Sequence, residues 1–187
     1  MTLLHRTIIS AIVTFMPFMA LSASDRDLMG LKGPVESVRV DFNSGGLEWS
    51  NFYRFSGDGN LTVVDDEPFT VERDVAGRIV KFTLTEEDED GAPQSIVTEI
   101  AYSSDGRVES TTNASLEEEW TDTYTYGSDG NVVRRDYRNP VESESFTYSY
   151  TADRDSHGNW LQRTEKSSSV PESIEQKRTI TYYSTEK

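Results

Sequence analysis

The residues with the greatest capacity for chemistry lie between positions 153 and 158. Asp153, Asp155 and His157 alternate there and lead to Gly158, which is the spacing of the first half of a calcium-binding loop. His157 stands where an oxygen ligand belongs, and Thr164 stands where a bidentate glutamate belongs. The flanking residues also alternate as strands do. The segment is therefore predicted to form a hairpin turn and to bind no metal.

His157 is the only histidine outside the first five residues, so a Ser-His-Asp triad would have to use it. No Gly-x-Ser-x-Gly nucleophile elbow occurs in the chain, and the absence of cysteine excludes thiol catalysis, iron–sulfur clusters and Cys-ligated zinc. His157 takes the place in its turn that Asp58, Asp105 and Asp129 hold in similar turns. We therefore predict that the protein is not an enzyme and carries no cofactor.

Acidic residues dominate the charge of the chain. Its 187 residues include 33 Asp and Glu against 18 Lys and Arg, for a formal net charge of −15. That balance argues against nucleic acid or an anionic membrane as the partner, because both attract clustered basic side chains. Two acidic runs are predicted on connectors or strand starts, where they either attract a basic protein partner or serve only solubility. These runs consist of Glu86, Glu87, Asp88, Glu89, Asp90, Glu117, Glu118 and Glu119.

The first 24 residues have the pattern of a secretory signal peptide. His5 and Arg6 form a short basic start, an apolar run covers residues 7–21, and small residues at 22–24 suit a signal peptidase. The run is short for a membrane span and contains Pro17. We therefore expect cleavage after Ser24, no stable membrane insertion, and export to the periplasm, cell surface or medium of a bacterium.

One short pattern recurs along the rest of the chain: an alternating aromatic run, a polar turn that ends in glycine, then Asn or Arg and an apolar residue. The marker glycines are separated by 18, 29, 24 and 28 residues, which is typical of stacked supersecondary units. A positive φ angle is expected at the first marker glycine and at the last three, because each closes a tight turn. The marker glycines are Gly59, Gly77, Gly106, Gly130 and Gly158.

Each copy of the pattern predicts a β-hairpin. Trp49, Tyr53 and Phe55 share one face of the run before the first turn, and period-two alternation is the signal of a strand. Apolar pairs then hold the two strands of each hairpin in register. The pairs expected to face one another are Phe55 with Leu61, Tyr102 with Val108, and Tyr126 with Val132.

The predicted fold class is all-β, an antiparallel meander of repeated hairpins. Residues 25–31 form a short turn of helix at most, and no connector is long enough to be an interdomain linker, so residues 25–187 are expected to form one domain. A meander of twelve strands rarely stays flat, so we expect a strongly curved or partly closed sheet, with an open sheet and two layers as alternatives. The predicted strands are 35–42, 47–55, 60–65, 69–74, 78–85, 95–103, 107–112, 118–126, 131–138, 144–154, 159–166 and 175–184.

The repeated units resemble the tyrosine–aspartate (YD) repeat of RHS-type exported bacterial proteins, over about residues 31 to 183. The Gly-Asn-apolar half of that motif is matched at Gly59, Gly130 and Gly158. The Tyr-Asp half is degraded: Tyr102 and Tyr126 are followed by Ser and Gly in place of aspartate. Large RHS proteins enclose a toxin in a shell of many repeats, and five units are too few for that role.

Aromatic residues offer the remaining functional lead. The three tryptophans, Trp49, Trp120 and Trp160, could stack on sugar rings if they were exposed, or form the core of a thin sheet, which is the more ordinary use of such residues. Three hypotheses follow: a protein–protein interaction module at the bacterial cell envelope, which we favour; a carbohydrate-binding module; and an acidic inhibitor or immunity-type protein that masks a basic partner.

Overall fold

The computed structural model describes residues 24–87, 92–116 and 118–184. The expected signal segment lies outside the described residues except for Ser24. Four of the predicted acidic positions also lie outside them: Asp88, Glu89, Asp90 and Glu117.

The described residues form one short helix and twelve strands, which confirms the all-β prediction. No helix in these ranges is long and apolar enough to cross a membrane. The strands lie close to the predicted ranges. The elements are α2 (Asp25–Leu28), β1 (Val35–Ser44), β2 (Leu47–Phe55), β3 (Leu61–Val64), β4 (Phe69–Arg73), β5 (Ile79–Glu87), β6 (Pro93–Tyr102), β7 (Val108–Ala114), β8 (Glu119–Tyr126), β9 (Val132–Arg138), β10 (Ser143–Tyr150), β11 (Gln162–Ser167) and β12 (Ser173–Tyr182).

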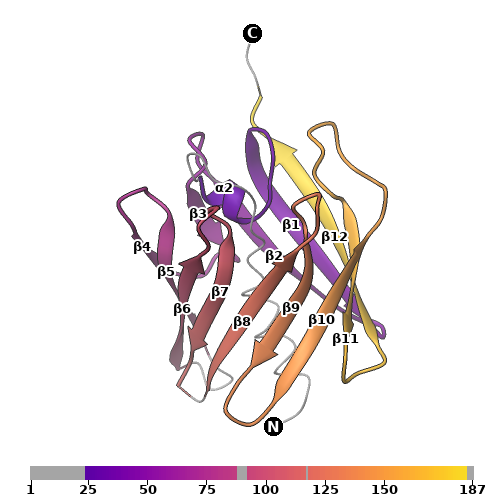
Figure 1. The fold of residues 1–187 in the computed structure, drawn as a ribbon. Helices are drawn as coiled ribbons and strands as arrows, with labels where there is room; N and C mark the ends of the chain where they lie inside the picture. Colours follow the sequence, from indigo (N-terminus) through magenta and orange to yellow (C-terminus); the bar gives the residue numbers. More distant parts are fainter. Residues whose placement is uncertain (1–23, 88–91, 117, 185–187) are drawn as a thin grey trace.

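All twelve strands belong to one antiparallel sheet with the order β3-β2-β1-β12-β11-β10-β9-β8-β7-β6-β5-β4. The sheet curls into a nearly closed, barrel-like form (Figure 1). Its two edges are β3 and β4, which follow one another in the chain but are not paired as strands. We call the gap between them the seam. The first and last strands in the chain, β1 and β12, are neighbours inside the sheet, where Val35 lies opposite Tyr182.

Alternation along each strand separates an inner face from an outer face. On β8, Trp120 and Tyr124 are buried while Glu119, Thr123 and Thr125 are exposed. Polar outward-facing side chains of this kind suit water, and the inward-facing aromatic side chains bury the apolar surface that stabilises the sheet.

Five turns share one backbone geometry, and all lie at the end of the sheet that carries α2, which we call the repeat-turn end (Figure 1). In the turn at Gly59, Ser56 N donates to Asn60 O and Gly59 N donates to Ser56 O; the same two bonds recur at the other four marker glycines. All five marker glycines have φ between +79° and +93°, which confirms the expected positive angles. The register across the turns confirms the three predicted apolar pairs.

Tyrosine hydroxyls join three of the units to the unit before. Tyr102 donates to Ile79 O over 2.6 Å, and Tyr126 donates to Val108 O over 2.8 Å. Tyr150 does the same to the carbonyl of the preceding unit. In every case the acceptor is the second residue after a marker glycine. The recurring tyrosine therefore fills the core with its ring and satisfies a backbone carbonyl with its hydroxyl.

The helix α2 bridges the seam at the repeat-turn end. Asp25, which is 1% exposed, accepts a bond from Leu61 N at 2.6 Å on the β3 side. Arg73, on β4, donates two bonds to the same carboxylate at 2.7 and 2.8 Å. Arg26 adds contacts to the turn between β2 and β3, including a bond to Gly57 O. A single buried carboxylate thus ties the two edge strands together.

Candidate functional site

A chain of polar side chains crosses the inner face of the sheet. From Thr98 it passes through Asn113 to Asp122 by hydrogen bonds of 2.8 and 3.3 Å. Arg135 then joins Asp122 to Glu165 with ion pairs of 3.3 and 3.4 Å. The inner polar chain consists of Thr98, Asn113, Asp122, Arg135, Glu165, Gln176 and Arg163, all of them buried.

The far end of the inner polar chain reaches β11 and β12. Gln176 donates to Glu165 at 2.9 Å and accepts from Arg163 Nε at 2.7 Å. Arg163 and Arg178 also lie over the Trp160 ring, at 5.0 and 3.7 Å from its centre. Burial, and then the neighbouring Arg163, lower the pKa of Arg178. Holding these cations inside the sheet costs free energy, which the cation–π contacts and hydrogen bonds offset.

The inner polar chain suits a structural role better than a chemical one. Its two carboxylates, on Asp122 and Glu165, are each held by Arg135 and by an amide. Burial raises the pKa of Asp122, and Arg135 opposes that rise. Carboxylates held on both sides in this way are poorly placed to exchange a proton with a substrate.

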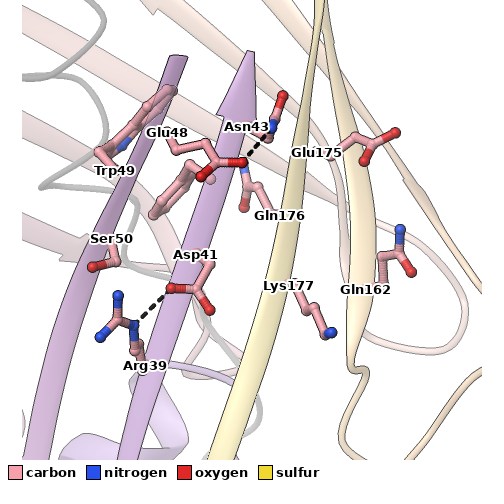
Figure 2. Close-up of a pocket in the computed structure, with 11 residues that line it drawn as sticks. Arg39, Asp41, Asn43, Glu48, Trp49, Ser50, Gln162, Glu175, Gln176 and Lys177 are labelled. Carbon is pink, nitrogen blue, oxygen red and sulfur yellow. Dashed lines mark hydrogen bonds and ion pairs between the residues drawn. The ribbon is translucent and has the colours of Figure 1, made fainter. Parts of the chain in front are cut away.

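The outer face carries a groove over β2, β1, β12 and β11, with a volume of about 460 Å³ (Figure 2). That volume falls within the range of about 300–1,000 Å³ that is usual for ligand pockets. Its outward-facing lining is polar, whereas Phe42, Trp49 and Gln176 border it from inward positions of their strands, where the Phe42 and Trp49 rings stack 5.1 Å apart. The lining residues are Arg39, Asp41, Phe42, Asn43, Glu48, Trp49, Ser50, Gln162, Glu175, Gln176 and Lys177.

Strand register arranges the groove side chains in two rows that run across four strands. In one row, successive members lie directly opposite one another: Ser50, Asp41, Lys177 and Gln162. The second row runs parallel to it and consists of Glu48, Asn43 and Glu175, with Thr164 opposite Glu175 outside the groove lining. Opposite residues in an antiparallel sheet lie about 5 Å apart, and rows two residues apart are separated by about 7 Å. The groove is therefore a regular lattice of donors and acceptors on a rigid sheet.

Only some of these groove side chains form hydrogen bonds with other side chains of the protein. Asp41 accepts a bond from Arg39 at 2.7 Å, and Glu48 accepts one from Asn43 at 3.0 Å (Figure 2). Gln176 bonds inward to Glu165 and Arg163. The remaining outward-facing polar side chains of the groove make no side-chain hydrogen bond or ion pair within the part of the chain that the structure describes. They are Ser50, Gln162, Glu175 and Lys177.

The predicted aromatic residues are divided between the core and the groove. Trp120 and Trp160 are 4% and 3% exposed, so neither ring is available at the surface. Trp49 lines the groove and is half-buried. A carbohydrate-binding surface built from all three tryptophans is therefore ruled out by burial, and Trp49 lies on the inward side of β2 with Asn51 and Tyr53.

The described members of the predicted acidic runs lie at one end of the sheet: Glu86 and Glu87 at the end of β5, Glu118 on the connector before β8, and Glu119 at the start of β8. Burial raises the pKa of Glu86, and Glu67 and Asp65 raise it further. Glu118 accepts a bond from Tyr137 at 2.7 Å and so stabilises its own loop. Glu119 is exposed. Glu87 ends β5.

The calcium-like segment forms the last of the five turns. Asp155 accepts from the backbone N–H groups of His157 and Asn159, both at 2.9 Å, so its carboxylate is occupied by its own turn. His157 stacks on Tyr182, with 4.2 Å between ring centres, and packs closely against Gly33. Within the described ranges, no group of three His, Asp or Glu side chains could hold a metal ion.

The sequence-based prediction missed both the inner polar chain and the groove. The inner polar chain has a signal in the sequence, because Arg135, Arg163 and Glu165 fall at inward positions of the alternation. The groove depends on β1 lying beside β12, and those strands are separated by most of the chain. No local pattern reveals that neighbourhood.

No protein-family model matches the chain, and no curated protein matches it. Among solved structures, the chain is similar to a porin-like protein from Bacteroides uniformis, with a TM-score of 0.40 and 13% identity. The match covers 80% of this chain and 99% of that chain. A similarity this distant carries no argument about function.

Proposed function

We propose that this protein is an exported, non-enzymatic binding protein of the bacterial cell envelope, and that the outer groove is its binding site. The proposal is supported by four polar side chains that line one concave surface and make no side-chain bond within the described residues. They are Ser50, Gln162, Glu175 and Lys177. The charged side chains Arg135, Asp122 and Glu165 on the inner face instead form ion pairs with one another. Polar groups left available in a groove are typical of a binding site.

The sequence supports the remaining parts of the proposal. Export rests on the basic start, apolar run and small residues of the first 24 positions. A place among YD-repeat proteins rests on the Gly-Asn-apolar turns at Gly59, Gly130 and Gly158. Absence of enzymatic activity rests on the lack of a nucleophile elbow and on His157 lying in a structural turn.

The proposal is tested by retention on immobilised envelope and secreted fractions. The wild-type protein is compared with a groove variant, S50A/Q162A/K177A, and with a control variant on the same outer face, T123A/T147A/K166A. We expect the fractions to retain the wild type and the control but to release the groove variant. Equal retention of all three folded proteins would remove the groove from the proposal.

A further inference from the structure

One strand at the border of the groove is covered along only part of its length. β3 pairs with β2 at residues 53–55 alone, and the chain then leaves β3 at residues 65–68 to reach β4. Residues 47–51 of β2 therefore have β1 on one side and, within the described residues, no strand on the other. We call residues 47–51 the open edge. It is about 17 Å long, which is room for an added strand of about five residues.

The open edge presents two backbone donors and two backbone acceptors. Phe52 O accepts from Asp65 N at 2.8 Å, so the backbone groups of Phe52 face away from β1. This direction alternates along a strand, so the N–H and C=O groups of Glu48 and Ser50 face the same way. Within the described ranges these four groups have no hydrogen-bond partner. Backbone groups left open in this way are a template to which a second polypeptide can add as a further strand.

Carboxylates lie along and beside the open edge. Glu48 is exposed on it, and the connector at residues 65–67, which begins beside Phe52, consists of three acidic residues. Burial, and then the charges of that connector, raise the pKa of Glu86 on β5, so this carboxylate lies near the connector. Arg54, the cation of β2, lies in the part that β3 covers. A segment that carries Lys or Arg would therefore meet charge of opposite sign here.

A second copy of this chain fits the open edge less well. Pairing two open edges would bring together two chains that each have a formal charge of −15, and their repulsion opposes that contact. A charged side chain such as Glu48 on an edge strand is also a common protection against association between copies. The same carboxylates that repel another copy attract a cationic segment.

We infer that the open edge of β2 binds an extended basic segment of a partner protein, which adds to the sheet as an antiparallel strand with its Lys or Arg side chains on the face of Glu48 and Ser50. This inference rests on the proposed function and names the partner of the same site, because Glu48 and Ser50 also line the groove. In an antiparallel pair, the residues opposite these two would exchange backbone bonds with them and share their face. The basic residues of the segment are therefore those whose N–H groups point at β2.

The test is calorimetric titration with a peptide of about nine residues that alternates Thr and Lys, and with its Thr-Glu counterpart. We expect the Thr-Lys peptide to bind and the Thr-Glu peptide to show no measurable binding. The affinity of the Thr-Lys peptide should fall about tenfold between about 50 and 500 mM salt, because salt screens the carboxylates.

N-methylated peptides test the backbone contact on the unaltered protein. Methyl groups on the Lys nitrogens remove the N–H groups that point at β2, so they should abolish binding. Methyl groups on the Thr nitrogens point away from β2, so they should leave the affinity within about twofold of the unmodified peptide.

Two protein variants test the other side of the contact. Ser50→Pro removes one donor of the open edge at a position where a strand tolerates proline, and should weaken binding of the Thr-Lys peptide about tenfold. D66N/E67Q removes two carboxylates beside the edge and should weaken it about fivefold. D153N/E172Q, which removes two exposed carboxylates elsewhere, is the matched control and should bind as the wild type does. If Ser50→Pro does not fold, the methylated peptides still decide the outcome.

The outcomes separate this inference from the proposed function. Equal binding of the Thr-Lys and Thr-Glu peptides, equal weakening by the two methylation patterns, or a wild-type dimer that Ser50→Pro dissociates would each overturn the inference. If folded Ser50→Pro retains envelope protein while the groove variant releases it, the inference fails and the proposed function stands. If the peptides behave as expected but the groove variant retains envelope material, the open edge stands without the rest of the groove. If neither peptide nor envelope material is bound, both fail.

Discussion

The two ends of the sheet are built in different ways. At the repeat-turn end, five turns share the same two backbone bonds, and α2 covers part of the rim. At the opposite end, the connectors differ in length and sequence, and Leu116 and Val141 are 81% and 88% exposed. Identical geometry at one end requires glycine at the same position of all five turns, whereas at the other end Gly45 and Gly46 have positive φ in the β1–β2 turn and the remaining connectors share no common glycine position. The repeated residues of this protein therefore serve its architecture, and its variable surfaces are available for binding.

The largest expected effect is at the bridge across the seam. Asp25→Ala leaves Arg73 and the Leu61 N–H without their buried acceptor, so the free energy of unfolding should fall by about 3 kcal/mol. Urea denaturation followed by fluorescence measures this change. Asp153→Ala, an exposed carboxylate at the same end, should have almost no effect. Equal losses in the two variants would show that Asp25 does not hold the edges together.

The next largest effect is expected from alanine substitution at two turn glycines, Gly59 and Gly77. Both have a positive φ angle, but their surroundings differ. Gly77 has open space around it, so Gly77→Ala should cost about 1 kcal/mol for the positive φ alone. An added Cβ at Gly59 would lie 2.5 Å from Ser24 Cβ and 2.7 Å from Arg26 Nε, so Gly59→Ala should cost about 2 kcal/mol or more. The melting temperatures of the two variants measure the two losses of stability. A larger loss at Gly77 would contradict the close packing of α2 on the first turn.

A smaller effect is expected from the tyrosine bonds between units. Tyr126→Phe keeps the ring but leaves Val108 O without the hydroxyl that donates to it at 2.8 Å, and should cost about 1 kcal/mol. Tyr102→Phe should cost a similar amount, since its hydroxyl makes the equivalent bond. Chemical denaturation measures both. Wild-type stability in both variants would mean that only the rings matter.

Acid unfolding should distinguish the carboxylates of the repeat-turn end. A hydrogen bond from the Ser103 side chain lowers the pKa of Asp105, and Ser56 does the same for Asp58. Stability from a lowered pKa is present above the unfolded-state value, near 4, and is lost as the pH falls through the folded-state value. Ser103→Ala should therefore move the acid midpoint, followed by circular dichroism, to higher pH. An unchanged midpoint would show that this bond is not coupled to folding.

At the opposite end of the sheet, stability should depend on pH in the reverse direction, and this effect is expected to be the smallest. Burial raises the pKa of Glu86 and also that of Asp65. A raised carboxyl pKa means that the folded state favours the protonated form, so its contribution to stability is present at low pH and is lost as the pH rises through the folded-state value. Glu86→Gln should therefore stabilise the protein slightly at pH 7 and leave it unchanged near pH 3. Destabilisation at pH 7 would contradict this interpretation.

Much of the fold could be predicted because its signals are local. Period-two alternation located the strands, and the glycine turns gave the cross-turn register of Phe55 with Leu61 and Tyr126 with Val132. The direction of the tyrosine hydroxyls was missed, because the acceptor of Tyr126 lies 18 residues earlier, in another unit. A ring at an apolar position does not indicate where its hydroxyl finds a partner.

The candidate site could be predicted only in part. Trp49 was identified as an aromatic candidate, and it lines the groove. Lys177 and Gln162 were not identified, because an exposed polar residue on a strand has no distinguishing local pattern. Their proximity to Asp41 arises from the pairing of β1 with β12, which couples residues more than 130 positions apart.

The position of the seam has a consequence for the connectivity of the fold. Because β3 and β4 are consecutive but form the two edges, the turn at residues 65–68 carries the chain across the seam without any strand pairing between them. Val35, at the start of β1, lies opposite Tyr182, at the end of β12. Joining those two points and cutting at residues 65–68 would give a circular permutant whose strands run from β4 through β12 to β3 in strictly sequential order. The native topology is thus a simple up-and-down ribbon whose beginning and end have been moved three strands along.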